Sequence, residues 1–486
     1  MEILINTVTF ALPVRRFLVD YAVTKQQQLP VVKEFVVRFI FTLQECHPDA
    51  IQQFFGMSSK ELYTVLSNLR EERLIVWEND QIKLSQYALS RFDSVGKSYV
   101  PRFFEITDQL DSVTFELLSY KMISDFAEGR WYPGNVELGL EPEAYKGTSE
   151  KAASAFDQKF TSFLERVKGL DTFSDHTSLY KINSVTPRAD QQLPIHANFY
   201  ADLPVLKRPI IEYADEWVDE WDDDQTIMSA INKSLSSSKS AKIRSQDQAQ
   251  AVMDYLHSTF DPFLGDCITR DGIDLNRVVL VSNTEHDPEA KTRMLFGNLY
   301  TPDNSSLILR LLDELQTQGI DEGQKKLDAN GIIWTVSQDD KLWGRSREFS
   351  DFIDALNERL DGRKSPGKVV LALEVSSVQE ARQVQDIYNF SKPEFQGVDS
   401  PFINRDSEIL LVPDCLVACL FHIKHQEFGS LTIPIGYVST DSKYVRAVHS
   451  KIKAWVADDR KFNSNLRRSP PRDEYNNLII SKVLKS

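Results

Sequence analysis

The order of turns and apolar spacings across residues 30–92 constrains the fold more than any other feature of this 486-residue chain. Residues 30–46 carry apolar side chains at helical spacing and predict an amphipathic helix. A short helix is expected next, over residues 49–55. Gly56 ends it, because a glycine backbone suits the tight turn between two packed helices.

A third helix and a hairpin are expected directly afterwards. Ser58 is a candidate N-cap, and Glu61 three residues later completes a capping box for a helix over residues 58–74. Two short strands around Asn79 and Asp80 predict a hairpin. The sequence therefore indicates three consecutive helices followed by a hairpin.

This order of elements resembles the winged helix-turn-helix family over about residues 30–92. The resemblance implies a recognition helix over residues 58–73 that enters a DNA major groove, with the hairpin touching phosphate. The candidate nucleic-acid contacts on that helix are Lys60, Thr64, Asn68 and Arg70. Residues 60–83, however, hold four basic and five acidic side chains, whereas a DNA-binding surface needs a positive excess. The charge balance favours packing or protein contacts.

Length and composition set the broad class of protein. A chain of 486 residues holds two to four domains at about 100–200 residues each. The net charge of −15 opposes general attraction to nucleic acid or to an anionic membrane. Four scattered cysteines indicate a reducing compartment, and the apolar N-terminal stretch, interrupted by Arg15, Arg16 and Asp20, is neither a signal peptide nor a membrane span. We expect a cytoplasmic protein with no membrane contact and no cofactor.

Residues 1–100 are expected to form the winged-helix-like module. The rest of the chain divides by its composition and its expected secondary structure. Residues 101–235 predict a mostly helical, acidic middle region. Its segment 212–224 is a candidate partner-binding surface, although a solvated helix anchored by two tryptophans is the favoured alternative. The candidate partner-binding residues are Trp217, Trp221, Asp222, Asp223 and Asp224.

A serine-rich stretch over residues 234–245 marks a boundary, and residues 246–458 then alternate strand-like and helix-like runs. The expected strands cover residues 277–282, 332–336, 368–375 and 408–412, and the expected helices cover residues 246–260, 304–318, 346–360, 378–388 and 443–456. This alternation predicts an α/β multidomain protein whose C-terminal domain holds a mixed sheet. The basic tail, residues 459–486, offers Arg467 and Arg468 for nucleic acid or an acidic partner.

Two segments resemble known ligand-binding motifs but lack part of the pattern. Residues 362–369 approach a phosphate-binding loop but precede a strand instead of following one, so they predict a turn. Cys415, Cys419, His422 and His425 are residue types that zinc uses, yet neither a strand nor a helix brings all four together. Core cysteines are the favoured interpretation, and no metal site is predicted.

The segment over residues 407–441 looks like the second half of a phospholipase D-like domain, a resemblance that covers at most residues 246–458. That family uses paired H-x-K-x4-D motifs. In the matching register Asp414 occupies the aspartate position, while Ser407 and Ile409 replace the histidine and lysine. The resemblance therefore implies a catalytically degenerate copy. The remaining candidates for a dispersed catalytic site are His422, Lys424 and Glu427.

These patterns favour a non-enzymatic subunit or adaptor of a multiprotein assembly, nucleic-acid-associated or of defence type, with other proteins as partners and DNA as a possible one. One alternative is a DNA-binding transcription regulator that acts through the winged helix. The other is a phosphodiesterase or nuclease with a dispersed site in the C-terminal domain.

Overall fold

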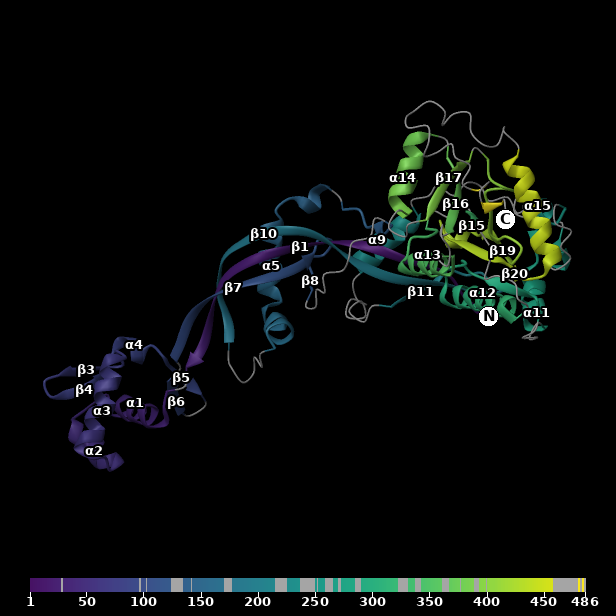
Figure 1. Cartoon of the computed structure of the whole chain (residues 1–486). Helices are drawn as coiled ribbons and strands as arrows, with labels where there is room; N and C mark the ends of the chain where they lie inside the picture. Colours follow the sequence, from purple (N-terminus) through teal and green to yellow (C-terminus); the bar gives the residue numbers. More distant parts are fainter. Residues whose placement is uncertain are drawn as a thin grey trace. The chain divides into compact units, whose positions relative to one another are not determined.

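The computed structural model describes residues 1–27, 29–95, 98–101, 103–123, 134–140, 142–169, 177–214, 225–236, 250, 252–257, 265–269, 272–284, 290–321, 331–336, 342–360, 367–375, 377–388, 393–398, 400–457, 480 and 483–484. The chain forms two compact units (Figure 1). The first comprises Met1–Pro13, Glu128–Leu140 and Gln192–Ser486, and the second comprises Val14–Ala127 and Glu141–Gln191.

The first strand, β1 (Glu2–Gln27), contributes residues to both units. It pairs antiparallel with β7 (Phe103–Glu116) from Val14 to Gln27, in a sheet of order β11-β10-β1-β7-β8, with β9 (Val136–Glu137) beside β1. Phe17, Val19 and Tyr21 are buried and alternate with the less buried Leu18 and Asp20. This period of two is the signature of a strand with one face in a core.

The prediction that residues 101–235 are mostly helical is wrong for the part of this region that the structure describes. Strands dominate it: β7, β8 (Met122–Ile123), β9, β10 (Thr177–Asp202) and β11 (Ile210–Tyr213). The described helices of this region are shorter in total, with α5 (Thr148–Gln158) and α9 (Gln225–Ser236) the longest. Every second residue from Leu193 to Ala201 is buried, so pairing with distant strands overrides local helix preference here.

The three helices and the hairpin lie where the spacing predicts them. They are α1 (Val31–Leu43), α2 (Pro48–Phe55), α3 (Ser59–Glu71), β3 (Ile75–Glu78) and β4 (Gln81–Leu84). The capping box of Ser58 and Glu61 is present, and Gly56 takes the left-handed backbone conformation at φ 64°. Asn79 and Asp80 also have positive φ, as a tight hairpin turn requires. We call residues 31–89, including α4 (Gln86–Leu89), the N-terminal module; its membership of the winged-helix family stays a prediction.

The C-terminal domain is mixed α/β, as expected. Its seven-stranded sheet has the order β14-β20-β19-β18-β15-β16-β17. These strands are β14 (Thr292–Phe296), β15 (Gly331–Thr335), β16 (Lys368–Glu374), β17 (Glu394–Val398), β18 (Ser407–Val412), β19 (Leu416–Lys424) and β20 (Thr432–Ser439). The pairs β15–β16 and β16–β17 are parallel, and the other neighbours are antiparallel.

Helices cover both faces of this sheet (Figure 1). One core packs α12 (Pro302–Asp321) and α13 (Arg347–Leu360) against the sheet, with Tyr388 of α14 (Val378–Tyr388) at its edge. The core of the opposite face packs α15 (Ser442–Val456). Such burial on both faces explains the nearly continuous apolar runs in the strands.

The prediction of a strand over residues 277–282 is wrong, because these residues lie in the helix α11 (Leu275–Thr284). The run of β-branched residues favours a strand locally. Asp274 begins a helix instead, because its carboxylate accepts hydrogen bonds from the backbone amides of Asn276 and Arg277 at 3.0 and 3.3 Å. Within the described part of the chain, no helix has the length and apolar character that crossing a membrane needs.

Replacing Gly436 tests the packing of the central strands. A β-carbon at this position of β20 would lie 1.8 Å from the carbonyl oxygen of Cys419 on β19, whereas one at Gly139 meets nothing within 4 Å. We expect Gly436→Ala to destabilise the protein by about 2 kcal/mol or more, since backbone must move. Gly139→Ala should be nearly neutral. Thermal unfolding compares the two, and equal melting temperatures would contradict the close approach of β19 and β20.

Candidate functional site

A polar cluster lies inside the C-terminal domain, where three neighbouring strands meet. Glu408 on β18 pairs with Leu420 on β19, so His422, two positions along β19, is its diagonal neighbour on the same face. Thr432 of β20 is in turn diagonal to His422, because the registered pairs are His422–Pro434 and Lys424–Thr432. The sheet register thus aligns an acid, a histidine and a hydroxyl.

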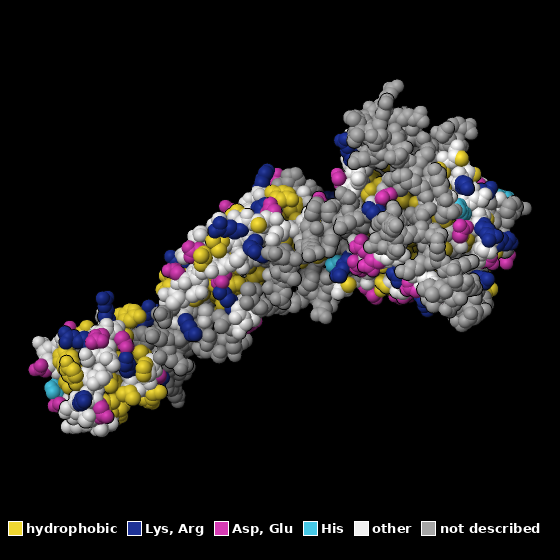
Figure 2. Space-filling view, viewed as in Figure 1, with side chains coloured by type: hydrophobic (Ala, Val, Ile, Leu, Met, Phe, Trp, Pro, Cys, Tyr) yellow, Lys and Arg dark blue, Asp and Glu magenta, His cyan; other side chains and the backbone are white. Residues whose placement is uncertain are grey.

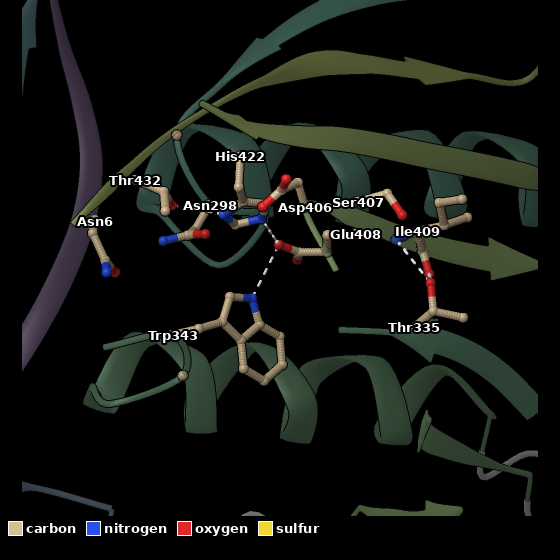
Figure 3. Close-up of polar contacts among 12 residues, drawn as sticks. Asn6, Asn298, Thr335, Trp343, Asp406, Ser407, Glu408, Ile409, His422 and Thr432 are labelled. Carbon is tan, nitrogen blue, oxygen red and sulfur yellow. Dashed lines mark hydrogen bonds and ion pairs between the residues drawn. The ribbon is translucent and has the colours of Figure 1, made fainter. Parts of the chain in front are cut away.

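These three side chains form a continuous hydrogen-bonded chain, and Figure 3 marks its link between His422 and Glu408. The Nε2 atom of His422 lies 2.7 Å from Oε2 of Glu408, and its Nδ1 atom lies 2.7 Å from Oγ1 of Thr432. The side chains of Glu408 and His422 are both 0% exposed. Both ring nitrogens are therefore engaged, and solvent does not reach them.

Two tryptophans complete the surroundings of the Glu408 carboxylate. The indole Nε1 of Trp334 donates to Oε1 at 2.9 Å, and that of Trp343 donates to Oε2 at 3.0 Å. A buried carboxylate is tolerated when several donors replace its hydration. We call Glu408, His422, Thr432, Trp334 and Trp343 the Glu408 network, in which these contacts hold the buried carboxylate in place.

Buried amides lie beside the network. Asn298 follows β14, and its backbone NH donates to the carbonyl of Ile5 on β1 at 3.0 Å. Asn6 accepts a hydrogen bond from the hydroxyl of Tyr300 at 2.9 Å. Neither side-chain polar atom of Asn298 has a hydrogen-bond partner among the described residues. Figure 3 places Asn298 between Asn6 and His422, so the polar region reaches the first strand.

The three catalytic candidates from the sequence are not assembled into one site. His422 is in the Glu408 network. Lys424, two residues on, forms an ion pair with Asp406 at 2.8 Å. Glu427, in the short helix η5 (Gln426–Phe428), is 44% exposed and lies 4.0 Å from Arg208. The three side chains contact different residues, and the structure does not bring them together into one site.

Sequence reasoning missed Glu408, Thr432 and both tryptophans. A usable signal was present: Glu408 is an acid at the start of an apolar run that predicts a buried strand. A buried carboxylate needs donors, and His422 in a neighbouring strand-like run was a candidate. The two indole donors could not be found this way, because they come from distant parts of the chain.

The three residues at the phospholipase D motif positions, Ser407, Ile409 and Asp414, have different surroundings and form no common site. A turn at residues 413–415 joins β18 to β19. Ser407 donates to the carbonyl of Asn404 at 3.0 Å, Ile409 is fully buried, and Asp414 in the turn is 61% exposed. The resemblance to that family stays a prediction.

The cysteine and histidine candidates are also dispersed. Cys419 and His422 are three residues apart on β19 and therefore point to opposite faces. Cys415 lies in the turn before β19, where burial, and then the nearby charge of Asp414, raise the pKa of its thiol to about 11. Within the described part of the chain, no group of three potential ligands could hold a metal ion.

The candidate DNA contacts of α3 lie on the outside of the N-terminal module. Lys60, Thr64 and Arg70 are exposed, and Asn68 is partly exposed. Tyr63, 75% exposed, stands among them. On the hairpin, Lys83 is neutralised by Glu45 at 3.0 Å and Glu78 at 3.3 Å. The hairpin therefore offers less positive charge to phosphate than its sequence suggests.

The other candidates from the sequence lie outside the described residues. These are Arg467 and Arg468 of the basic tail, and Trp217, Trp221, Asp222, Asp223 and Asp224 of the acidic segment.

An apolar groove lies between α1 and α2 of the N-terminal module. Its volume is about 350 Å³, and its lining is Phe35, Arg38, Phe39, Thr42, Leu43, Phe54 and Phe55. Phe35, Leu43 and Phe54 are 52%, 47% and 68% exposed, and Figure 2 shows hydrophobic side chains on the visible face of this module. Exposed apolar patches of this kind mark interaction surfaces.

Comparisons with known proteins add little. No protein family model matches the chain, and no curated protein matches it. Among solved structures, TrmBL2, described as an archaeal chromatin protein with a novel mode of DNA binding, is aligned with a TM-score of 0.22 and 10% identity, over 89% of this chain and 94% of that chain. A similarity this low supports no conclusion about fold or function.

The Glu408 network should stabilise the C-terminal domain. Glu408→Ala leaves two buried indole NH groups and a histidine without their acceptor, so we expect a loss of about 3 kcal/mol or more. The matched control Glu427→Ala removes an exposed acid and should cost less than about 0.5 kcal/mol. Guanidinium unfolding measures both.

A double variant separates lost packing from lost pairing. Glu408→Leu combined with His422→Leu still leaves both indole NH groups without an acceptor, but it fills the space and removes the unpaired histidine, so it should cost less than Glu408→Ala alone. If Glu408→Ala and Glu427→Ala unfold at the same denaturant concentration, the Glu408 network contributes nothing to the free energy of unfolding.

Proposed function

We propose that this chain is a non-enzymatic subunit or adaptor of a multiprotein assembly. The observation that carries the proposal is the enclosure of His422, the candidate catalytic histidine of the C-terminal domain, together with the separate surroundings of Lys424 and Glu427. His422 uses both ring nitrogens inside a core that is 0% exposed at the Glu408–His422 pair, and Lys424 is paired with Asp406. Groups held in this way support a fold instead of acting on a substrate.

The surface of the N-terminal module supports the same proposal. Tyr63 on α3 is 75% exposed, and Trp77 on β3 is 44% exposed. Aromatic residues are enriched at protein interfaces because one side chain buries a large apolar area. We therefore assign partner binding to the exposed face of α3 and the hairpin.

Affinity purification of the full chain from its native host tests the adaptor proposal. We expect a stoichiometric partner protein that Tyr63→Asp and Trp77→Asp release, because each places a charge in an apolar contact. The double variant Lys424→Ala with Glu427→Gln should retain both the partner and the cellular activity. Purification of the chain alone, together with loss of cellular activity in that double variant, would favour the dispersed phosphodiesterase or nuclease site instead.

A DNA-binding regulator is the second candidate, favoured by the exposure of Lys60, Thr64 and Arg70 along α3. Under this proposal the chain binds duplex DNA with an affinity that falls steeply with salt, because each phosphate contact releases a counterion. Lys60→Glu combined with Arg70→Glu should abolish binding in a fluorescence anisotropy titration. Absence of wild-type binding at about 50 mM salt, where such contacts are strongest, would remove this candidate.

A further inference from the structure

The helix α15 of the C-terminal domain concentrates positive charge in an acidic chain. Between Ser442 and Val456 it holds four lysine or arginine residues and no aspartate or glutamate, although the whole chain has a net charge of −15. By contrast, α12 and α13 both carry more acidic than basic side chains. We call the four cations of α15 the α15 basic face: Lys443, Arg446, Lys451 and Lys453.

The packing of α15 turns these four cations outward. All four are exposed. At about 100° per residue, they lie within an arc of about 160° that is centred opposite the buried side of the helix. Figure 2 shows Lys and Arg side chains at the edge of the domain where Figure 1 places α15. The buried side packs against the sheet through five apolar residues: Val445, Val448, Ile452, Trp455 and Val456.

The four cations are not paired with the protein's own acids. Within the described part of the chain, no acidic side chain forms an ion pair with any of them, and the ammonium of Lys443 lies 5.8 Å from the centroid of the Tyr444 ring. Elsewhere in the same domain the pattern differs, since Arg347 pairs with Asp351. The α15 basic face therefore keeps its charge available for a ligand.

The surface between the cations is made of small side chains, namely Ala447, Ser450 and Ala454. Among the residues that the structure describes, no large apolar side chain of α15 is exposed. Protein interfaces depend on buried aromatic or aliphatic anchors, and binding of unpaired bases depends on aromatic rings for stacking. A phosphate backbone needs only cations and hydrogen-bond donors. The composition of this face therefore fits the backbone of a nucleic-acid duplex best.

The length of the face also fits a duplex. Lys443 and Lys453 are ten residues apart, which is about 15 Å along a helix. One strand of a DNA duplex has a phosphate every 3.4 Å or so along the axis, so about four phosphates lie within this length. The acidic remainder of the chain opposes binding weakly, because charges more than about 10 Å away are largely screened at 0.1 M salt.

We propose that the α15 basic face binds the phosphate backbone of double-stranded nucleic acid without reading its sequence. The C-terminal domain then has a nucleic-acid contact of its own, and an adaptor with this surface holds its partner protein on nucleic acid. The face shares no residue with the α3 and hairpin surface assigned to a partner protein. The adaptor proposal and this one can therefore fail separately.

Anisotropy titration of the full chain with a short fluorescent DNA duplex tests the proposal. With four phosphate contacts, the logarithm of the wild-type association constant should fall with the logarithm of salt concentration with a slope of about −3 to −4. The α15 variant, Arg446→Gln with Lys453→Gln, removes two contacts. We expect it to reduce the slope by about 2 and to weaken binding about 100-fold at about 50 mM salt. The loss should be the same for a duplex of another sequence, because phosphate contacts carry no sequence information.

Two further variants serve as comparisons. The control variant, Arg310→Gln with Arg347→Gln, makes the same change in net charge on α12 and α13, which cover the opposite face of the sheet. It should bind DNA as the wild type does. The α3 variant, Lys60→Glu with Arg70→Glu, should also retain binding here, whereas it abolishes binding if the chain is a regulator that holds DNA through α3. Circular dichroism checks that every variant is folded.

Four outcomes would overturn the proposal. The wild-type chain could fail to bind the duplex at about 50 mM salt, where phosphate contacts are strongest. The α15 variant could bind with the affinity and salt slope of the wild type. The control variant could lose as much affinity as the α15 variant, which would make net charge the cause. The wild-type chain could also leave DNA unbound while the α15 variant, but not Tyr63→Asp, releases a protein in the host purification; the face then docks an acidic protein.

Discussion

The desolvated carboxylate of Glu408 is the constraint on which the C-terminal domain depends. It ties β18 to β19 through His422, to β15 through Trp334, and to the segment after β15 through Trp343. Each contact replaces a hydrogen bond that water would make in the unfolded chain. A pairing error that shifted one of these strands by one residue would turn its polar side chain to the opposite face and leave the carboxylate buried without donors. The network thus favours one register of the sheet over its alternatives.

This enclosure also explains why the domain can hold residues typical of chemistry without an assembled site. A histidine beside an acid is a frequent catalytic pair, but it acts when one ring nitrogen can exchange a proton with a substrate. In the Glu408 network the second nitrogen faces Thr432 of the next strand. The same two residue types therefore stabilise a core here, in keeping with the adaptor role proposed above.

The sequence predicted elements whose signals are local, including the apolar strands β15, β16 and β18, and missed the long strands β1 and β10. Ser58, Glu61 and Gly56 mark helix ends within a few residues, and α1, α2 and α3 lie where they indicate. The strands β1 and β10 have no such markers, since their partners are far along the chain. At residues 277–282 a strand-like composition was overridden by the capping aspartate Asp274. In the Glu408 network the acid and the histidine could be anticipated from their strands, but the two indole donors could not.

The long strand β1 has a consequence for how the protein is made. It is synthesised before both of its long neighbours: β7 begins 76 residues after β1 ends, and β10 follows later still. At roughly 5–20 residues per second, a ribosome completes β10 many seconds after β1 has emerged. During that interval β1 has an unpaired edge that invites association with other chains. The biogenesis of this protein therefore calls for either a chaperone that covers β1 or an early pairing with β7 that shields one edge until β10 arrives.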